Sequence, residues 1–125
     1  MLIDTDVLIW YLRGNAKAAK HIEKSKPVLL SAITYMELVQ GMRNKQELLA
    51  LRRTLKDYGW KILPLDEDIS HRAMIYLEEH FLSHALRMAD ALIAATAVQH
   101  GLGILTANDK HYRVITELTI DRFSK

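Results

Sequence analysis

The sequence predicts one α/β domain in which a short, mostly parallel sheet carries helices on both faces. Two observations predict it: short apolar segments alternate with helical patterns, and the connections between them are short. This alternation is typical of βαβ units, which join parallel strands. A length of 125 residues is close to the commonest domain size, and two prolines and five glycines leave no linker. We therefore expect residues 1–125 to form a single domain.

The strands are predicted from short apolar runs that end in polar or turn residues. Such runs indicate strands rather than helices because they are too short for helical turns to repeat. They cover residues 1–3, 28–30, 60–63, 103–106 and 120–123.

The helices are predicted from apolar spacing at three and four residues and from glycines that stop a helix. Residues 45–58 show the amphipathic pattern most clearly, with Leu48, Leu51, Leu55 and Tyr58 on one stripe. The expected helices cover residues 4–12, 16–24, 34–39, 45–58, 66–81 and the alanine-rich run 88–101.

Composition excludes several classes of protein. Without cysteine the chain has no disulfide framework, no thiol catalysis and no thiolate metal site. No apolar run approaches the ~20 residues of a membrane helix, and two aspartates interrupt the N-terminal run, unlike a signal peptide. We therefore expect a cytoplasmic protein with no membrane contact. The balance of 17 basic and 15 acidic residues neither proves nor excludes a nucleic-acid partner.

Candidate catalytic side chains gather where the predicted strands end. In open α/β sheets ligands bind beyond the carboxyl ends of the strands. Asp4 follows the first strand, and Glu37 lies in the first turn of the helix after the second. Asn108 and Asp109 follow the fourth strand, and Asp90 begins the alanine-rich helix.

Each of these residues also has a purely structural interpretation. Asp4 suits a helix cap, and Thr34-x-x-Glu37 has the pattern of a capping box. Asp90 suits the positive end of a helix, although its neighbours are almost all apolar. The two polar residues after the fourth strand suit a turn.

A joint interpretation of the acids points to a metal. If Asp4, Glu37 and Asp90 converge, like charges about 4 Å apart repel by roughly 4 kcal/mol per pair at an effective dielectric near 20. Such a cluster takes up protons or binds a cation. Carboxylate oxygens without cysteine favour Mg²⁺, with Mn²⁺ as an alternative, over zinc. A divalent cation held in this way serves hydrolysis of a phosphate ester.

Four segments, in order, resemble the motifs of PIN-domain ribonucleases of the VapC type, the toxins of toxin–antitoxin pairs. The resemblance spans almost the whole chain, and the segment 118–123 is similar to the closing segment of that family. The four segments are MLIDTDVLI at 1–9, SAITYMELVQG at 31–41, DALIAATA at 90–97 and LTANDKHY at 105–112.

The resemblance implies a PIN-like three-layer sandwich and a metal-dependent endoribonuclease. Asp4, Glu37 and Asp90 match the three acidic positions of the family. Asp4 and Asp90 would be direct Mg²⁺ ligands, and Glu37 would hold a second metal or orient the attacking water. The resemblance also implies RNA as substrate, a homodimer, and a small antitoxin protein whose tail covers the acidic site.

The fourth motif departs from the family pattern. Many relatives place an acid two residues after the threonine or just before the aromatic residue, and here these places hold Asn108 and His111. Asp109 lies between them, and which of the three fills the position stays open. Asp6 stands where asparagine is common. The departure bears on the second metal rather than on the fold.

Two alternatives compete with the endoribonuclease. The first is a catalytically silent PIN-like module that binds RNA or a protein, which the altered fourth motif favours and the three retained acids disfavour. The second is a haloacid-dehalogenase-like phosphatase, because Asp4-Thr-Asp6 follows an apolar strand. That family wants threonine or valine two residues beyond the second aspartate, where this chain has Leu8.

Overall fold

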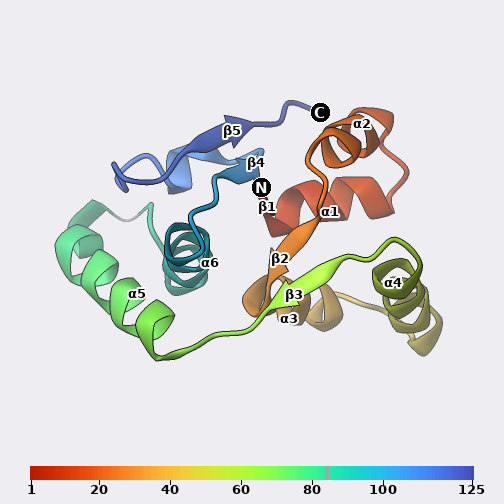
Figure 1. The fold of residues 1–125 in the computed structure, drawn as a ribbon, viewed down its shortest axis with the longest axis horizontal. Helices are drawn as coiled ribbons and strands as arrows, with labels where there is room; N and C mark the ends of the chain where they lie inside the picture. The colour runs from red at the N-terminus through yellow and green to blue at the C-terminus, as the bar shows by residue number, and fades with distance from the viewer. Residues whose placement is uncertain (84) are drawn as a thin grey trace.

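The computed structural model describes residues 1–83 and 85–125 and contains a five-stranded sheet in which every strand pair is parallel (Figure 1). The strand order is β3-β2-β1-β4-β5, so the first strand lies at the centre. Leu2 pairs with Leu29 on one side and with Ile104 on the other. The predicted parallel sheet is confirmed. Its strands are β1 (Leu2–Ile3), β2 (Leu29–Ser31), β3 (Lys61–Leu63), β4 (Ile104–Thr106) and β5 (Ile120–Arg122).

Helices connect these strands close to the predicted positions. Gly59 and Gly101 follow two of them with φ of 65° and 66°, a left-handed conformation that glycine adopts without strain. No helix of the described residues is long and apolar enough to cross a bilayer. The α-helices are α1 (Thr5–Leu12), α2 (Ala16–Lys24), α3 (Ala32–Gln40), α4 (Lys45–Asp57), α5 (Glu67–His80) and α6 (Met88–Gln99), and the 3₁₀ turns are η1 (Phe81–Ser83) and η2 (Asp109–His111).

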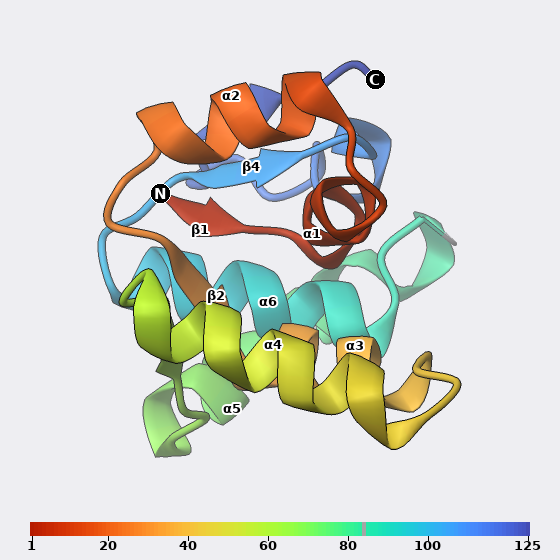
Figure 2. The same cartoon turned by 90° about the vertical axis from the view of Figure 1, so that its right-hand side faces the viewer.

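The two faces of the sheet carry separate hydrophobic cores. Successive residues of a strand point to opposite faces, so Leu2 and Ile3 enter different clusters although both are fully buried. Leu2 packs in the cluster that contains Ile93 of α6, together with α5. Ile3 packs in the cluster that contains Leu8 of α1 and Ile22 of α2, together with α4. Figures 1 and 2 show the resulting helix–sheet–helix layers, which confirm the predicted three-layer sandwich.

One local interpretation is wrong. The helix α3 begins at Ala32, because the hydroxyl of Ser31 caps it by accepting a hydrogen bond from the Ile33 N–H at 3.0 Å. Thr34 is therefore inside the helix and fully buried, and Thr34-x-x-Glu37 is not a capping box. Glu37 lies in the second turn of α3 rather than in the first. Its side chain is consequently available for other contacts.

Phe123 fixes the end of the chain beside the carboxyl edge of the sheet. Its side chain is 1% exposed, and its ring meets that of His21 edge-on with centroids 5.4 Å apart. Its backbone N–H donates to the Thr106 carbonyl at 2.7 Å. The last residues are thereby attached to the strand end that carries Thr106.

We expect Phe123→Ala to lower the free energy of unfolding by about 3–5 kcal/mol, because it leaves a cavity between the strand end and α2. Urea unfolding followed by circular dichroism measures the change. Phe81→Ala is the matched control, since Phe81 is 66% exposed and its loss should matter by no more than about 0.5 kcal/mol. Equal destabilisation by the two variants would contradict the assignment of Phe123 to the core.

Candidate active site

Asp4 occupies the centre of the carboxyl edge. Its side chain directly follows β1, is 6% exposed, and caps α1 by accepting a hydrogen bond from the Thr5 N–H at 2.9 Å. The other carboxylate oxygen accepts from the hydroxyl of Thr106, at the end of β4, at 2.8 Å. The cap interpretation is therefore confirmed, and the same carboxylate also connects two adjacent strand ends.

Asp6 is a second carboxylate at this edge, and sequence reasoning did not place it among the site residues. Its Oδ1 accepts from the Val7 N–H at 2.8 Å. Its Oδ2 accepts from the Ala107 N–H at 3.0 Å and from the Asn108 side-chain amide at 2.8 Å. Asp6 thus joins the start of α1 to the loop after β4. Its signal in the sequence was the departure from asparagine at this position.

Burial and mutual repulsion disfavour the charges of both aspartates. Burial, followed by the negative charge of Asp6, raises the pKa of Asp4 from 3.8 to about 7. Burial also raises the pKa of Asp6, opposed by the hydrogen bonds from the Ala107 and Val7 amides. Within the described residues, neither carboxylate forms an ion pair with lysine or arginine. This edge of the sheet therefore favours bound protons or a bound cation.

Glu37 approaches this edge from α3. Its Oε1 accepts a hydrogen bond from the Thr5 hydroxyl at 2.6 Å, and the same hydroxyl lies 3.1 Å from that of the buried Thr34. Glu37 itself is exposed. Glu37 and Asp4 are therefore linked through Thr5, whose hydroxyl donates to Glu37 and whose backbone N–H donates to Asp4.

Asp90 approaches from the first turn of α6. Its Oδ2 accepts from the Arg87 N–H at 3.0 Å, which satisfies one free amide at the start of the helix. Its Oδ1 lies 3.7 Å from Nδ1 of His111, and its side chain is 14% exposed. The structural interpretation of Asp90 as a helix-start residue is confirmed, while its second oxygen faces the fourth motif.

Tyr112 lies among these carboxylates. It is fully buried, and its hydroxyl has no hydrogen-bond partner in the part of the chain that the structure describes. Burial raises its pKa, and the negative charges of Asp4 and Asp90 raise it further. Both acids therefore lie near enough to this phenol for their charges to raise its pKa. In the sequence, Tyr112 stood out only as the aromatic residue of the fourth motif.

The residues of the fourth motif separate into two groups. Asn108 joins the site through its hydrogen bond to Asp6. Asp109 instead accepts from Arg113 at 2.7 and 2.9 Å, and Arg122 lies 3.7 Å from its other oxygen. Its pKa is lowered, chiefly by the hydrogen bonds from Arg113. The charge of Asp109 is thus balanced by arginines, whereas the charges of Asp4 and Asp6 are not.

The donor set fits a hard divalent cation in kind. Carboxylates with raised pKa and a buried phenol hydroxyl without a partner are oxygen groups that a cation would stabilise. No three acidic or histidine side chains among the described residues are yet arranged around one point that could hold a metal ion. Three acids therefore reach a single ion only if their side chains rotate towards it.

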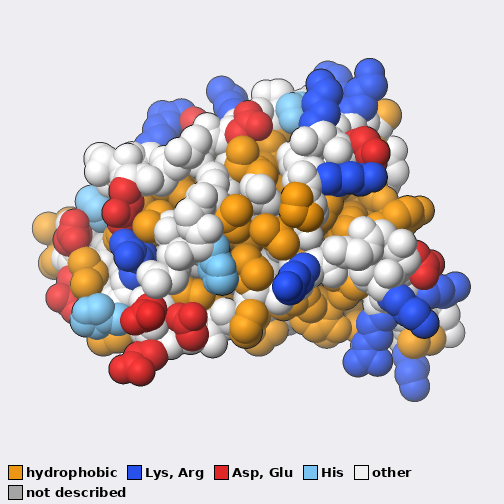
Figure 3. Space-filling view, viewed as in Figure 1, with side chains coloured by type: hydrophobic (Ala, Val, Ile, Leu, Met, Phe, Trp, Pro, Cys, Tyr) orange, Lys and Arg blue, Asp and Glu red, His pale blue; other side chains and the backbone are white. Residues whose placement is uncertain are grey.

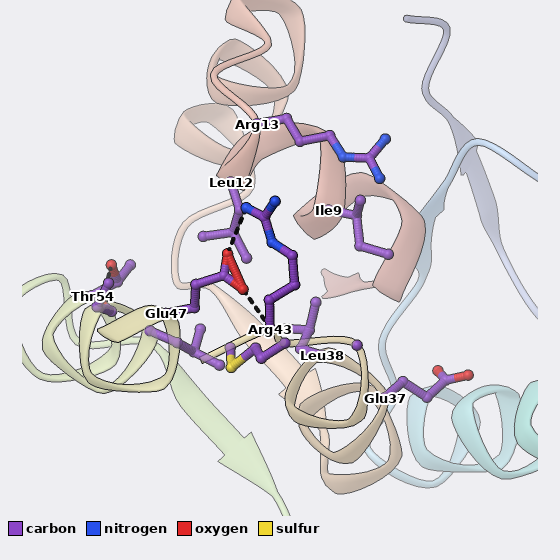
Figure 4. A pocket seen from close by; sticks show the side chains of 12 residues that line it. Ile9, Leu12, Arg13, Glu37, Leu38, Arg43, Glu47 and Thr54 are labelled. Atoms are coloured by element: carbon purple, nitrogen blue, oxygen red, sulfur yellow. Dashed lines mark hydrogen bonds and ion pairs between the residues drawn. The ribbon is translucent and has the colours of Figure 1, made fainter. Parts of the chain in front are cut away.

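A groove of about 790 Å³ opens beside this edge between α1, α3 and α4 (Figure 4). Its walls are mainly apolar and include Leu12, Leu38 and Leu51. Glu37 lies at one side of it, and Arg13 extends from the end of α1. Its lining also holds the ion pair of Arg43 with Glu47, and Glu37 is the site acid that borders it.

Over nearly its whole length the chain is similar to proteins named ribonucleases and to a chain of a toxin–antitoxin complex. The sequence model described as PIN domain matches residues 1–117. Two proteins of Mycobacterium tuberculosis, Ribonuclease VapC10 and Ribonuclease VapC19, are 33% and 30% identical over 122 residues, which cover 94% of this chain and 90% and 95% of theirs. A solved toxin–antitoxin complex from Klebsiella pneumoniae contains a chain that is 29% identical, with a TM-score of 0.80 and 94% of each chain covered.

We expect Asp4→Asn to stabilise the metal-free protein at pH 8. The folded-state pKa near 7 means that folding takes up a proton between about pH 4 and 7, so the stability of the wild type falls as the pH rises through this range. Asparagine carries no charge to desolvate. The gain grows to a maximum of about 4 kcal/mol above pH 7, the equivalent of the raised pKa.

Urea unfolding in EDTA at pH 5 and pH 8 measures this difference. Asp57→Asn, an exposed change at the end of α4, should leave stability within about 0.5 kcal/mol at both pH values. An Asp4→Asn protein that is less stable than wild type at pH 8 would refute the expected burial cost.

Proposed function

Because the chain belongs to the PIN domain family, we propose that it is a Mg²⁺-dependent endoribonuclease, with Mn²⁺ as an alternative, and the toxin of a toxin–antitoxin pair. The observation that carries the proposal is the buried, uncompensated carboxylate of Asp4 beside Asp6. A carboxylate buried without a basic partner costs stability, and a bound cation would offset that cost. The names of the VapC10 and VapC19 relatives support RNA as the substrate.

Asp4 and Asp90 are the proposed metal ligands, and Glu37 is the third acid of the site. A bound divalent cation would neutralise charge on the phosphate and lower the pKa of water. The chain's own contribution is to position its oxygens. Thr106 and the Thr5 amide fix the orientation of Asp4, while the Arg87 amide fixes one oxygen of Asp90.

The proposed reaction is in-line hydrolysis of an RNA phosphodiester. Water attacks phosphorus, the bond from phosphorus to the leaving oxygen breaks, and that oxygen takes up a proton. Glu37 is exposed and bound through one oxygen to Thr5, so its other oxygen is free to orient the attacking water. The fourth-motif amide of Asn108 positions Asp6 rather than supplying charge.

We further propose that a small antitoxin protein inhibits the enzyme. The similar chain from Klebsiella pneumoniae was solved in a toxin–antitoxin complex, and the apolar groove beside Glu37 offers a path for a peptide segment towards the acids. A homodimer in the cytoplasm completes this proposal. The purified product of a short neighbouring reading frame should abolish RNA cleavage when mixed with the protein, and light scattering measures the oligomeric state.

One observation favours a second candidate, a catalytically silent PIN-like module. The described acids do not surround a single point closely enough for three of them to hold one ion. Such a module would bind RNA or a protein without cutting. The phosphatase alternative finds no support, because the family match and the relatives belong to another family.

We expect Asp90→Asn to lower the rate of RNA cleavage in Mg²⁺ by at least about 100-fold, since even a residue that only supports a metal ligand contributes about 10- to 100-fold. The wild type and the variant are compared on a panel of structured RNAs with Mg²⁺ or with EDTA. The wild type should cut only with Mg²⁺.

Asp57→Asn removes an equal charge from an exposed position and should cut like the wild type. Equal cleavage by wild type and Asp90→Asn would show that a contaminating nuclease or a different site is responsible. Absence of cleavage by the wild type on every RNA, with RNA still bound, would favour the silent module.

A further inference from the structure

We propose that Asp6 and Asn108 act as a single unit in which Asp6 supplies the fourth negative charge of the cation site and Asn108 holds it in place. This inference rests on the proposed function. It assigns the fourth charge to the start of α1 and not to the loop after β4, and it makes Asp6 a positioning residue for a hydrated divalent cation.

Asp6 and Asn108 are in direct contact. They are separated by 102 positions in the sequence, yet the Asn108 amide donates to Oδ2 of Asp6 at 2.8 Å. Asn108 is itself oriented, because its backbone N–H donates to the Thr106 hydroxyl at 3.0 Å. An amide at 108 supplies the donor, and a carboxylate at 6 supplies the charge.

The carboxylate of Asp6 lies close to that of Asp4. The Thr106 hydroxyl lies 2.8 Å from Oδ2 of Asp4 and 3.5 Å from Oδ2 of Asp6, so the two carboxylates flank one hydroxyl. Hydrogen bonds from neutral amides and hydroxyls orient both groups but bring no positive charge to them. A cation is the ligand that such a pair would take.

The contacts of Oδ2 of Asp6 with the loop after β4 do not need a negative charge. The carbonyl oxygen of an asparagine at position 6 could accept from the Ala107 N–H and the Asn108 amide just as Oδ2 of Asp6 does. An asparagine would therefore keep the contacts of Asp6 with the loop after β4 without carrying a charge. It would lose only the contact of Oδ1 with the Val7 N–H, because its amide nitrogen is a donor.

The acid of the fourth motif, Asp109, is already neutralised by arginines. Asp109, the other candidate for the fourth charge, is bound by Arg113 and lies 3.7 Å from Arg122. Asp6 forms no ion pair with lysine or arginine among the described residues, and the basic residue that acts on it is His111, whose charge lowers its pKa. Since Oδ2 of Asp6 already accepts from both the Ala107 N–H and the Asn108 amide, and Oδ1 accepts from the Val7 N–H, Asp6 acts on a cation through its charge and through water.

The test compares Asp6→Asn, the exchanged protein Asp6→Asn/Asn108→Asp, and the control Asp57→Asn. Isothermal titration calorimetry with MgCl₂ or MnCl₂ alone, without RNA, measures cation affinity. Thermal unfolding in EDTA shows whether each variant is folded, and RNA cleavage is measured in a separate assay.

We expect Asp6→Asn to weaken cation binding by about 10- to 100-fold while the protein still unfolds cooperatively in EDTA. The exchanged protein should bind cations at least about tenfold more tightly than Asp6→Asn, because a carboxylate returns within hydrogen-bond distance of the original one. Asp57→Asn should match the wild type.

Two results would overturn the inference alone. One is wild-type cation affinity in Asp6→Asn, and the other is an exchanged protein that binds cations no better than Asp6→Asn. A wild type that neither binds Mg²⁺ or Mn²⁺ nor cuts RNA would overturn the proposed function and the inference together.

Discussion

The buried carboxylate of Asp4 is the constraint around which the rest of the site is arranged. The strand β1 is only two residues long and central, so the first residue beyond it lies inside the molecule. Three groups stabilise its charge: the Thr5 amide, the Thr106 hydroxyl and the positive end of α1. They leave the carboxylate with a pKa near 7, so the chain alone does not fully compensate it.

The order of the strands decides which side chains meet this carboxylate. Because β4 is the parallel neighbour of β1, its last residue, Thr106, lies at the same edge as Asp4. The loop after β4 therefore passes Asp6, and η2 then directs Tyr112 inward between Asp4 and Asp90. A helix that is buried on most sides, α6, supplies Asp90 at its start.

The sequence predicted the elements well because their signals are local. The helix expected at 16–24 has the observed bounds of α2, and the strand expected at 120–123 agrees with β5 within one residue. The start of α3 was misplaced because Ser31 and Thr34 are both good cap residues, and the burial of Thr34 against Thr5 decides between them. That contact is tertiary and leaves no local pattern.

Individual site residues could be predicted from the sequence, but the contacts between them could not. The position of Asp4 followed from strand ends, whereas the contact of Asp6 with Asn108 depends on the register between strands far apart in the sequence. Asp109 is one residue further along and turns towards Arg113 instead. Two consecutive residues of a tight turn thus point to different partners: Asn108 contacts Asp6, whereas Asp109 is neutralised by arginine.

The distribution of charge over the surface complements this acidic edge. Figure 3 shows lysines and arginines gathered over α2 and α4 and acids over α5. The four acids at the edge, Asp4, Asp6, Glu37 and Asp90, leave 11 of the 15 acidic residues against 17 basic ones elsewhere. A polyanion is attracted by that surface but repelled by the uncompensated carboxylates. The proposed divalent cation would reverse the repulsion at the edge alone, so its binding would control where a phosphate can approach.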